Sequence, residues 1–205
     1  MFRNCRFLES APSALPAWEL AQECYANMFW GCESLVNAPE ILGQRTEVSC
    51  FVNMFKECTS LIDAPELNLN RLTLSCCSGM FAGCTSLVNP PALPMTELAI
   101  SCYSGMFEGC TSLEVAPVLP ATQLEHGCYD VMFRGCSNLS RIEAMFLSDP
   151  GDVHMYNGVE YPNTDYTNNW VDGVAENGVF VKNSSTSWET RNNSAIPRSW
   201  EIELK

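Results

Sequence analysis

A repeated unit of about 26 residues constrains this chain more than any other feature. Met-Phe pairs recur at Met1, Met28, Met54, Met80, Met106 and Met132, and their spacing is constant after the first unit, which is slightly longer. A fixed period of this length is typical of proteins whose repeats stack, so that each repeat buries its apolar face against its neighbours. The sequence therefore predicts an elongated stack of repeats.

Leucine, proline and cysteine keep fixed places within the unit. The pattern reads M-F-x-G-C-T-S-L-x-x-A-P-x-L-P, and a C-Y-x-x segment then leads into the next Met-Phe. One cysteine follows each Met-Phe and a second precedes the next Met-Phe by four residues, so eleven of the twelve cysteines occupy two repeat positions. Only Cys77 is extra, since it stands where other units have an aromatic residue. Both cysteine positions are expected to form columns along the stack.

Each unit is expected to contain a short strand and a short helix. The segment from Ser-Leu to Pro-x-Leu has closely spaced apolar residues, which predicts a strand. Proline withholds an N–H from a sheet, so its recurrence in this segment predicts bridges only two or three residues long. In residues 100–107 the apolar side chains suit one helical face. The glycines expected to end these helices, since a C-terminal cap favours positive φ, are Gly31, Gly83, Gly109 and Gly135.

Two regions follow from the extent of the repeats. Residues 1–147 are predicted to form about five to six repeat units, and residues 148–205 a connector and a capping segment that is rich in Asn, Ser, Thr and Asp. Residues 169–182 predict a short helix, a turn and a strand, and residues 155–161 predict a small hairpin around Asn157-Gly158. The expected fold class is a right-handed α/β repeat solenoid with short strands, short helices and a small C-terminal cap.

The motif M-F-x-G-C-T-S-L-x-x-A-P-x-L-P with C-Y-x-x-M-F resembles the leucine-rich repeats of BspA-like surface proteins of anaerobic bacteria. The resemblance covers roughly the first 145 residues, and the ending from Ile196 to Ile202 also resembles the segment that follows such repeats. It implies a secreted or cell-surface adhesion module that binds a protein or a glycan and has no catalytic residues. The unit is longer than the commoner repeats of about 23 residues, and it carries proline inside the expected strand.

Charge and hydropathy narrow the classes of partner. The net charge of -13 disfavours nucleic acid and anionic membrane surfaces, and it indicates either plain solubility or an acidic face for a cationic partner or Ca²⁺. No apolar run reaches the ~18 residues needed to span a bilayer. The first residues lack the apolar region of a signal peptide and are already in repeat register at Met1. An upstream continuation of the chain, or a partner at this end, is therefore expected.

The cysteine spacing does not fit a metal site. Seven residues separate the two cysteines around Met-Phe and seventeen separate the next pair, whereas metal sites use close pairs, and no histidine accompanies them. Across a helix two such cysteines lie about 12 Å apart, beyond the roughly 7 Å that a disulfide spans. Neighbouring repeats at ~4.8 Å are close enough for a disulfide. We expect a column of buried thiols, with disulfides between repeats as the alternative.

Catalytic chemistry has little support in the sequence. The only histidines are His126 and His154, and His126 lies beside Cys128. A Cys–His nucleophile is conceivable there, but Cys128 belongs to a repeat column and no orienting partner is apparent. Residues 149–169 hold Asp and Asn without the spacing of a Ca²⁺ loop. We expect no enzyme, no cofactor and no metal.

A binding face is expected at variable positions on the strand side, where a row of aliphatic residues marks a contact surface. The candidate residues are Val36, Asn37, Glu40, Ile62, Asp63, Glu66, Val88, Asn89, Glu114 and Val115. The leading hypothesis is a noncatalytic module that binds a protein or a glycan through this face. The alternative is a structural appendage, such as a phage-type decoration module, that assembles through its uncapped N-terminal repeat.

Overall fold

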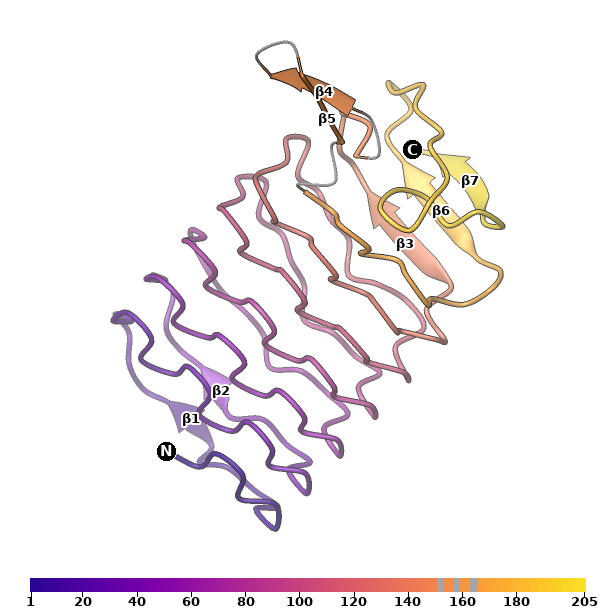
Figure 1. Cartoon of the computed structure of the whole chain (residues 1–205). Helices are drawn as coiled ribbons and strands as arrows, with labels where there is room; N and C mark the ends of the chain where they lie inside the picture. Colours follow the sequence, from indigo (N-terminus) through magenta and orange to yellow (C-terminus); the bar gives the residue numbers. More distant parts are fainter. Residues whose placement is uncertain (151–152, 157–158, 163–165) are drawn as a thin grey trace.

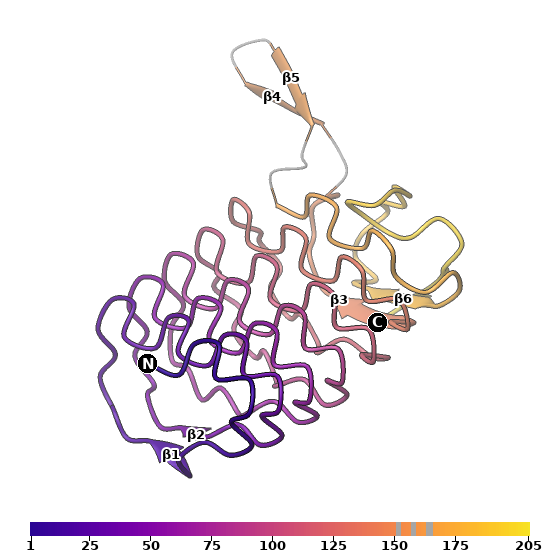
Figure 2. The same ribbon diagram turned by 60° about the horizontal axis from the view of Figure 1, so that its bottom comes forward.

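The computed structural model describes residues 1–150, 153–156, 159–162 and 166–205. Its repeats form coils that lie side by side, from the indigo N-terminal coil to the yellow C-terminal segment (Figures 1 and 2). Equivalent residues of successive coils are neighbours, as the parallel bridges from Asn37 to Asp63 and from Asp63 to Asn89 show. The coils therefore stack in the register of the sequence repeat.

Strands are few and short. The structure contains β1 (Ala14–Leu15), β2 (Glu40–Ile41), β3 (Arg141–Ala144), β4 (Val153–Tyr156), β5 (Val159–Pro162), β6 (Val179–Lys182) and β7 (Glu201–Leu204). β1 and β2 pair in parallel, β3, β6 and β7 form a parallel sheet in that order, and β4 pairs with β5 in antiparallel fashion. β1 and β2 have the expected length of two residues, whereas most of the middle coils are joined on this side by single-residue bridges, which are shorter than the two or three residues expected next to the repeated proline.

The predicted α/β class is wrong, because the described residues contain no helix. The C-Y-x-x-M-F segments consist instead of successive tight turns, and we call their stacked array the turn ladder, which comprises residues 23–32, 49–58, 75–84, 101–110 and 127–136. Alternate residues donate their N–H to the carbonyl three residues earlier, as Met54 does to Phe51 at 3.1 Å. The residues between them donate to the next coil, as Phe55 does to Met80 at 2.8 Å. In a helix every N–H bonds within its own segment, whereas here alternate N–H groups bond within their own coil and the others bond to the next coil.

Positive φ at every fourth residue explains why no helix forms. In one coil Ser49, Asn53 and Glu57 have φ of 55°, 51° and 61°. A right-handed helix needs negative φ at every residue. The glycines predicted as helix caps do adopt positive φ, with Gly31 at 72° and Gly109 at 73°, but they lie in the turn ladder rather than after a helix.

Aromatic and leucine side chains form continuous columns inside the stack. Neighbouring rings of the phenylalanine column have centroids 5.5–5.8 Å apart and nearly parallel planes, and the column runs through Phe2, Phe29, Phe55, Phe81, Phe107 and Phe133. The leucines that follow Thr-Ser or Cys-x-Ser in the repeat are fully buried, as Leu61 and Leu87 are. The core is therefore a bundle of columns, to which each coil adds one layer.

The cysteines form two further columns. All twelve are free thiols, and ten are buried. In the column after Met-Phe, each buried thiol donates to a phenylalanine carbonyl of the preceding coil, as Cys58 does to Phe29 at 3.2 Å and Cys84 to Phe55 at 3.1 Å. The geometry agrees with the expected column of buried thiols. Each S–H is a small apolar filler that also satisfies a backbone oxygen.

The C-terminal segment closes one end of the stack. Residues 166–173 form a last row of turns, so the helix predicted within residues 169–182 is wrong, whereas the strand predicted there is confirmed as β6. Phe133 donates its N–H to Trp170 at 2.8 Å, and the Trp170 Nε1 donates to Ala195 at 2.9 Å. The predicted hairpin is confirmed in its two strands, β4 and β5, while its turn residues 157–158 lie outside the described residues.

Candidate functional site

The predicted binding face is exposed on the strand side of the stack. All ten residues have exposed side chains, in three rows: Val36, Ile62, Val88 and Glu114; Asn37, Asp63, Asn89 and Val115; and Glu40 with Glu66. The buried leucine before each row fixes the register, since Leu35, Leu61 and Leu87 point into the core. The residue after each leucine is thereby directed outward.

The rows are continuous between neighbouring coils. Val36, Ile62 and Val88 are 42%, 44% and 48% exposed, so a row of aliphatic side chains faces solvent until Glu114 ends it. In the adjacent row the Asn89 Nδ2 donates to the Asp63 Oδ1 at 2.6 Å. The structure thus brings the first two rows together as neighbouring apolar and polar stripes.

A groove lies beside these rows, between the coils that carry Pro90 and Pro117. It has a volume of about 650 Å³ and is lined by Glu66, Pro90, Pro91, Ala92, Leu93, Pro94, Ala116, Pro117, Val118 and Pro120. Among the predicted residues only Glu66 lines it. The sequence reasoning missed the other nine. One signal for them was present, since Ala92 and Val118 replace Glu40 and Glu66 at the same repeat position.

The groove is apolar and its walls are stiff. Nine of its ten lining residues are Pro, Ala, Leu or Val, and five of these are proline. Proline fixes its own φ, and the wall residues Pro91, Leu93 and Pro117 are themselves buried, so the surface keeps its shape in the absence of a ligand. Its volume lies in the range of about 300–1,000 Å³ that is typical of binding pockets. The arrangement can hold apolar side chains, and it offers no group for bond-breaking chemistry except the exposed Glu66.

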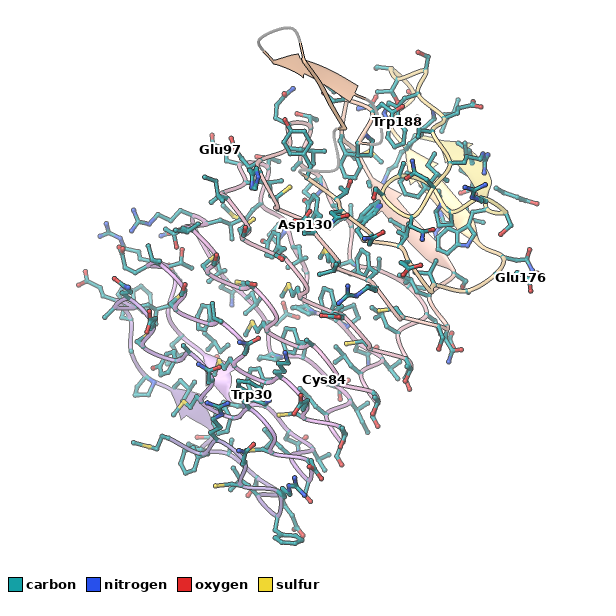
Figure 3. All side chains as sticks on the ribbon, in the orientation of Figure 1. Trp30, Cys84, Glu97, Asp130, Glu176 and Trp188 are labelled. Carbon is teal, nitrogen blue, oxygen red and sulfur yellow. The ribbon has the colours of Figure 1, made fainter. Side chains whose placement is uncertain are left out.

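The ring of Trp30, which is labelled in Figure 3, is covered by neighbouring side chains. The Arg3 guanidinium lies 3.9 Å from the ring centroid and the Lys56 ammonium 5.2 Å from it. The indole Nε1 donates to the Glu57 carboxylate at 3.0 Å. Because these contacts use its faces and its only donor, Trp30 ties three coils together and is not a free binding surface.

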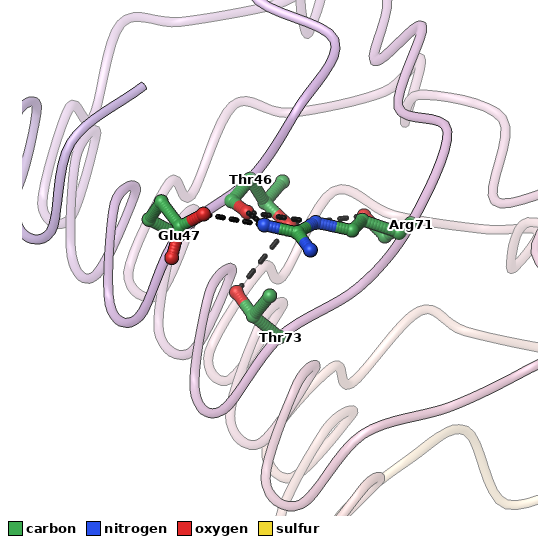
Figure 4. Close-up of polar contacts among 4 residues, drawn as sticks. All are labelled: Thr46, Glu47, Arg71 and Thr73. Atoms are coloured by element: carbon green, nitrogen blue, oxygen red, sulfur yellow. Dashed lines mark hydrogen bonds and ion pairs between the residues drawn. The ribbon is translucent and has the colours of Figure 1, made fainter. Parts of the chain in front are cut away.

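The side chains around Arg71 also join coils (Figure 4). The buried Thr46 donates its hydroxyl to the Arg71 carbonyl at 3.0 Å, and the Arg71 Nη2 donates to the Thr46 carbonyl at 3.1 Å. Arg71 also forms an ion pair with Glu47, and the Thr73 hydroxyl bonds that of Thr46 at 3.3 Å. The guanidinium is thereby engaged, which indicates a structural role.

The cysteine next to the exposed His126 is a poor nucleophile. Cys128 is fully buried, and burial raises the pKa of its thiol to about 12, so little thiolate exists at neutral pH. Within the described part of the chain, no group of three or more His, Cys, Asp or Glu residues is arranged to hold a metal ion. Among the same residues, none forms a helix with the length and apolar character needed to cross a bilayer.

Comparisons with known proteins add no assignment to this geometry. No protein-family model, no curated protein and no solved structure matches the chain.

Proposed function

We propose that the protein is a noncatalytic module that binds an apolar, positively charged segment of a partner protein. The observation that carries this proposal is the preformed groove between the coils of Pro90 and Pro117, next to a face of exposed aliphatic residues. Exposed apolar side chains that gather in a concave surface are typical of contact sites. A stack of coils suits such a task, because it presents side chains of successive repeats as one extended surface.

The apolar part of the partner follows from the lining. Side chains such as Leu, Val, Pro or Phe lose water on entering the groove without leaving polar groups unpaired, at roughly 25 cal/mol per Å² of apolar surface buried. A rigid wall of proline also lowers the entropy lost on binding. Val118 and Ala92 are exposed on the groove surface and are the residues expected to contact the partner first.

The cationic part follows from the carboxylates around the groove. Glu66 lines it, and Glu40 occupies the same position one coil earlier. Within the described residues, neither side chain forms an ion pair. The net charge of -13 adds a field that steers cationic ligands toward the molecule.

A protein fits the groove better than a glycan. Sugar hydroxyls need donors and acceptors on the protein, and an unpaired hydroxyl in an apolar site costs free energy. Glu66 supplies the only polar side chain of the lining. The resemblance of the repeats to BspA-like surface proteins supports a secreted or cell-surface location for the module, and that location is part of the proposal.

The test uses peptides that combine two or three aliphatic or aromatic residues with lysine or arginine, titrated by fluorescence anisotropy. We expect saturable binding that Val118→Arg weakens at least tenfold, because it places a bulky charge in the groove. Ile100→Arg is the matched control, since Ile100 is 48% exposed and Val118 47% exposed, and only Val118 lines the groove. Equal weakening by both substitutions would contradict a groove-specific site.

A charge substitution tests the second half of the proposal. Glu66→Gln is expected to weaken binding severalfold at low salt and to lower its salt dependence, whereas Glu189→Gln in the C-terminal segment leaves both unchanged. A glycan that binds in a groove-dependent manner, with no binding by any peptide, would replace the protein partner by a carbohydrate.

A further inference from the structure

Neighbouring coils are bridged on the strand side at two sites that flank the repeated proline. The site before the proline is bridged between these residues: Ser10 and Asn37, Asn37 and Asp63, Asp63 and Asn89, and Val115 and Arg141. The site after the proline is bridged by β1 with β2 and by Leu119 with Ala144. Among the described residues, the coils of Pro90 and Pro117 are the one neighbouring pair that is bridged at neither site. We call the strand-side contact between these two coils the Pro90 boundary, and the groove lies on it.

Pro90 explains why the bridge before the proline is missing there. One coil earlier, Ala64 donates its N–H to the Asn89 carbonyl at 3.0 Å. One coil later, Ala116 donates its N–H to the Arg141 carbonyl at 2.9 Å. Pro90 stands at the same repeat position, where the other units have alanine, and it has no N–H to donate to the next coil. The double proline therefore opens the strand side between these two coils.

Three backbone groups at the Pro90 boundary have no partner. Val88 and Ser140 donate their N–H groups to the preceding coil at 3.0 and 2.9 Å, but Glu114, at the same repeat position, does not. Within the described part of the chain, no residue bonds to the Glu114 N–H or to the carbonyls of Val88 and Val115. A strand edge with unpaired N–H and carbonyl groups is a template for the addition of an extended segment.

The boundary one coil earlier shows how an extended segment pairs with such an edge. There the Ile62 carbonyl accepts an N–H at 3.0 Å, and Ala64, two residues later, donates its own N–H at 3.0 Å. An extended peptide copies this pattern at the Pro90 boundary with a carbonyl that accepts from Glu114 and, two residues later, an N–H that donates to Val115. Its side chains alternate between two faces, so every second one can enter the adjoining groove.

The charges around the Pro90 boundary suit a cationic segment. The sequence contains no lysine or arginine between Arg71 and Arg134. Two exposed carboxylates lie close by, since Glu66 lines the groove and Glu114 carries the unpaired N–H. A segment with lysine or arginine therefore meets carboxylates and no like charge from these coils, which favours its association.

We propose that the cationic, apolar partner segment binds in an extended conformation at the Pro90 boundary, where its backbone pairs with the Glu114 N–H and the Val115 carbonyl and its alternate apolar side chains enter the groove. This inference rests on the proposed function, because it describes how the same segment is held. Pro90 is then a specificity-determining residue, since it leaves the backbone of the next coil open to a partner. A helical segment pairs its own N–H groups internally and does not satisfy this edge.

Methylation of single peptide amides tests the backbone pairing. In a cationic, apolar peptide, each backbone N–H is replaced in turn by N–CH₃, and the affinity for the full chain is measured by fluorescence anisotropy. We expect at least a tenfold loss at the amide that donates to Val115 and less than a threefold loss at the two neighbouring amides. The reason is that successive N–H groups of an extended chain point in opposite directions.

Substitutions at Pro90 test its role in keeping the boundary open. Pro90→Ala and Pro90→Val both restore an N–H, and valine also keeps the apolar bulk of the groove wall. We expect slow hydrogen exchange of the new amide in the free protein and at least tenfold weaker peptide binding, because the amide takes the Val115 carbonyl. Pro65→Ala is the matched control, since Pro65 is a half-buried strand-side proline like Pro90 but does not line the groove. It should leave the affinity within twofold.

The outcomes separate this inference from the proposed function. Peptide binding that Val118→Arg weakens, but that no amide methylation weakens, would overturn the backbone pairing and leave the proposed function standing. Absence of binding by every peptide would overturn both. Fast exchange of the new amide in both Pro90 variants, while Cys84 and Cys110 remain protected from alkylation and the stack is thus folded, would overturn the role of Pro90.

Discussion

At the scale of single residues, the turn ladder depends on side chains that tolerate unusual surroundings. Gly79, Gly83 and Gly109 hold positive φ, while the first coils place Asn4 and Asn53 in the same conformation. Glycine and asparagine adopt this region at the lowest cost. The stack also requires small side chains in its interior, and buried cysteine is one that donates a weak hydrogen bond to a backbone oxygen.

A substitution at Gly109 measures the cost of positive φ without a steric clash, because a Cβ there meets no atom closer than 3.8 Å. Gly109→Ala is expected to lower the free energy of unfolding by about 1–2 kcal/mol through φ strain alone. Gly109→Asn is expected to lower it less, since Asn4 stands at the equivalent position of the first coil with φ of 59°. Urea unfolding measures both. Equal losses for alanine and asparagine, or no loss for alanine, would contradict the strain argument.

The buried thiols make stability depend on pH. Burial raises the pKa of Cys50, Cys84 and Cys136 from 9.0 to about 12. The folded chain keeps these thiols protonated, whereas the unfolded chain releases their protons above pH 9.0. Their contribution is thus fully present below that pH and is lost as the pH rises toward about 12, by up to about 1.4 kcal/mol per thiol and pH unit.

Urea unfolding in reducing buffer at neutral pH and at about pH 11 checks this dependence. We expect a much lower midpoint at the higher pH. The serine hydroxyl of Cys84→Ser does not titrate in this range. The free energy of unfolding of this variant should therefore fall less with rising pH, by the contribution of one thiol. A midpoint that does not change with pH would show that the thiols are not protected from ionisation in the folded state.

At the scale of elements, the coil is a unit whose energy lies in its contacts with two neighbours. Phe81 stacks between Phe55 at 5.6 Å and Phe107 at 5.8 Å, and all three rings are fully buried. Contact energy in such an array follows the number of neighbouring layers. A terminal coil therefore holds its side chains less firmly than a central one.

Phenylalanine truncations at two positions measure this difference. Phe81→Ala is expected to cost about 3–5 kcal/mol, because it opens a cavity between two rings. Phe2→Ala is expected to cost roughly half as much or less, since Phe2 is half-buried and stacks on one ring only. Both values come from urea unfolding. Similar costs at the two positions would contradict a contact energy that depends on the number of neighbouring rings.

At the scale of the whole molecule, the C-terminal segment caps the stack, and cysteine exposure reports on the order of the coils. Only Cys5 and Cys24 are exposed. Thiols reach an alkylating reagent when they lie at the surface, while buried thiols react only after the chain opens. The pattern of labelling therefore maps the order of the coils.

Alkylation without reduction is expected to label two thiols in the folded protein and all twelve after unfolding in urea, as read by intact mass. Trp170→Ala, which removes a fully buried ring from the cap, should expose the last coil and add Cys128 and Cys136 to the labelled set before the central cysteines. Fewer than twelve labels in the unfolded chain would reveal disulfides between coils. Labelling of all cysteines at one rate would contradict the expectation that the last coil opens before the central coils.

The sequence by itself determined the repeat, its register and the identity of the core. Leu, Phe, Met and Cys at fixed repeat positions are buried in the structure, because apolar side chains that recur in every unit can avoid water only by stacking on their counterparts. The exposed positions of the predicted binding face follow from the same alternation around the buried leucine. Even the period of four in the turn ladder is present in the sequence, where Cys102, Met106 and Cys110 are four residues apart.

Only the tertiary structure decided between helix and turn ladder. A helix pairs each N–H with a carbonyl four residues away, whereas the ladder pairs every second N–H with a carbonyl of the next coil, as Phe51 does with Cys76. Local sequence patterns do not indicate a hydrogen-bond partner that lies a whole repeat further along the chain. The groove was hidden for the same reason, since its walls come from two coils whose prolines become neighbours only when the chain stacks.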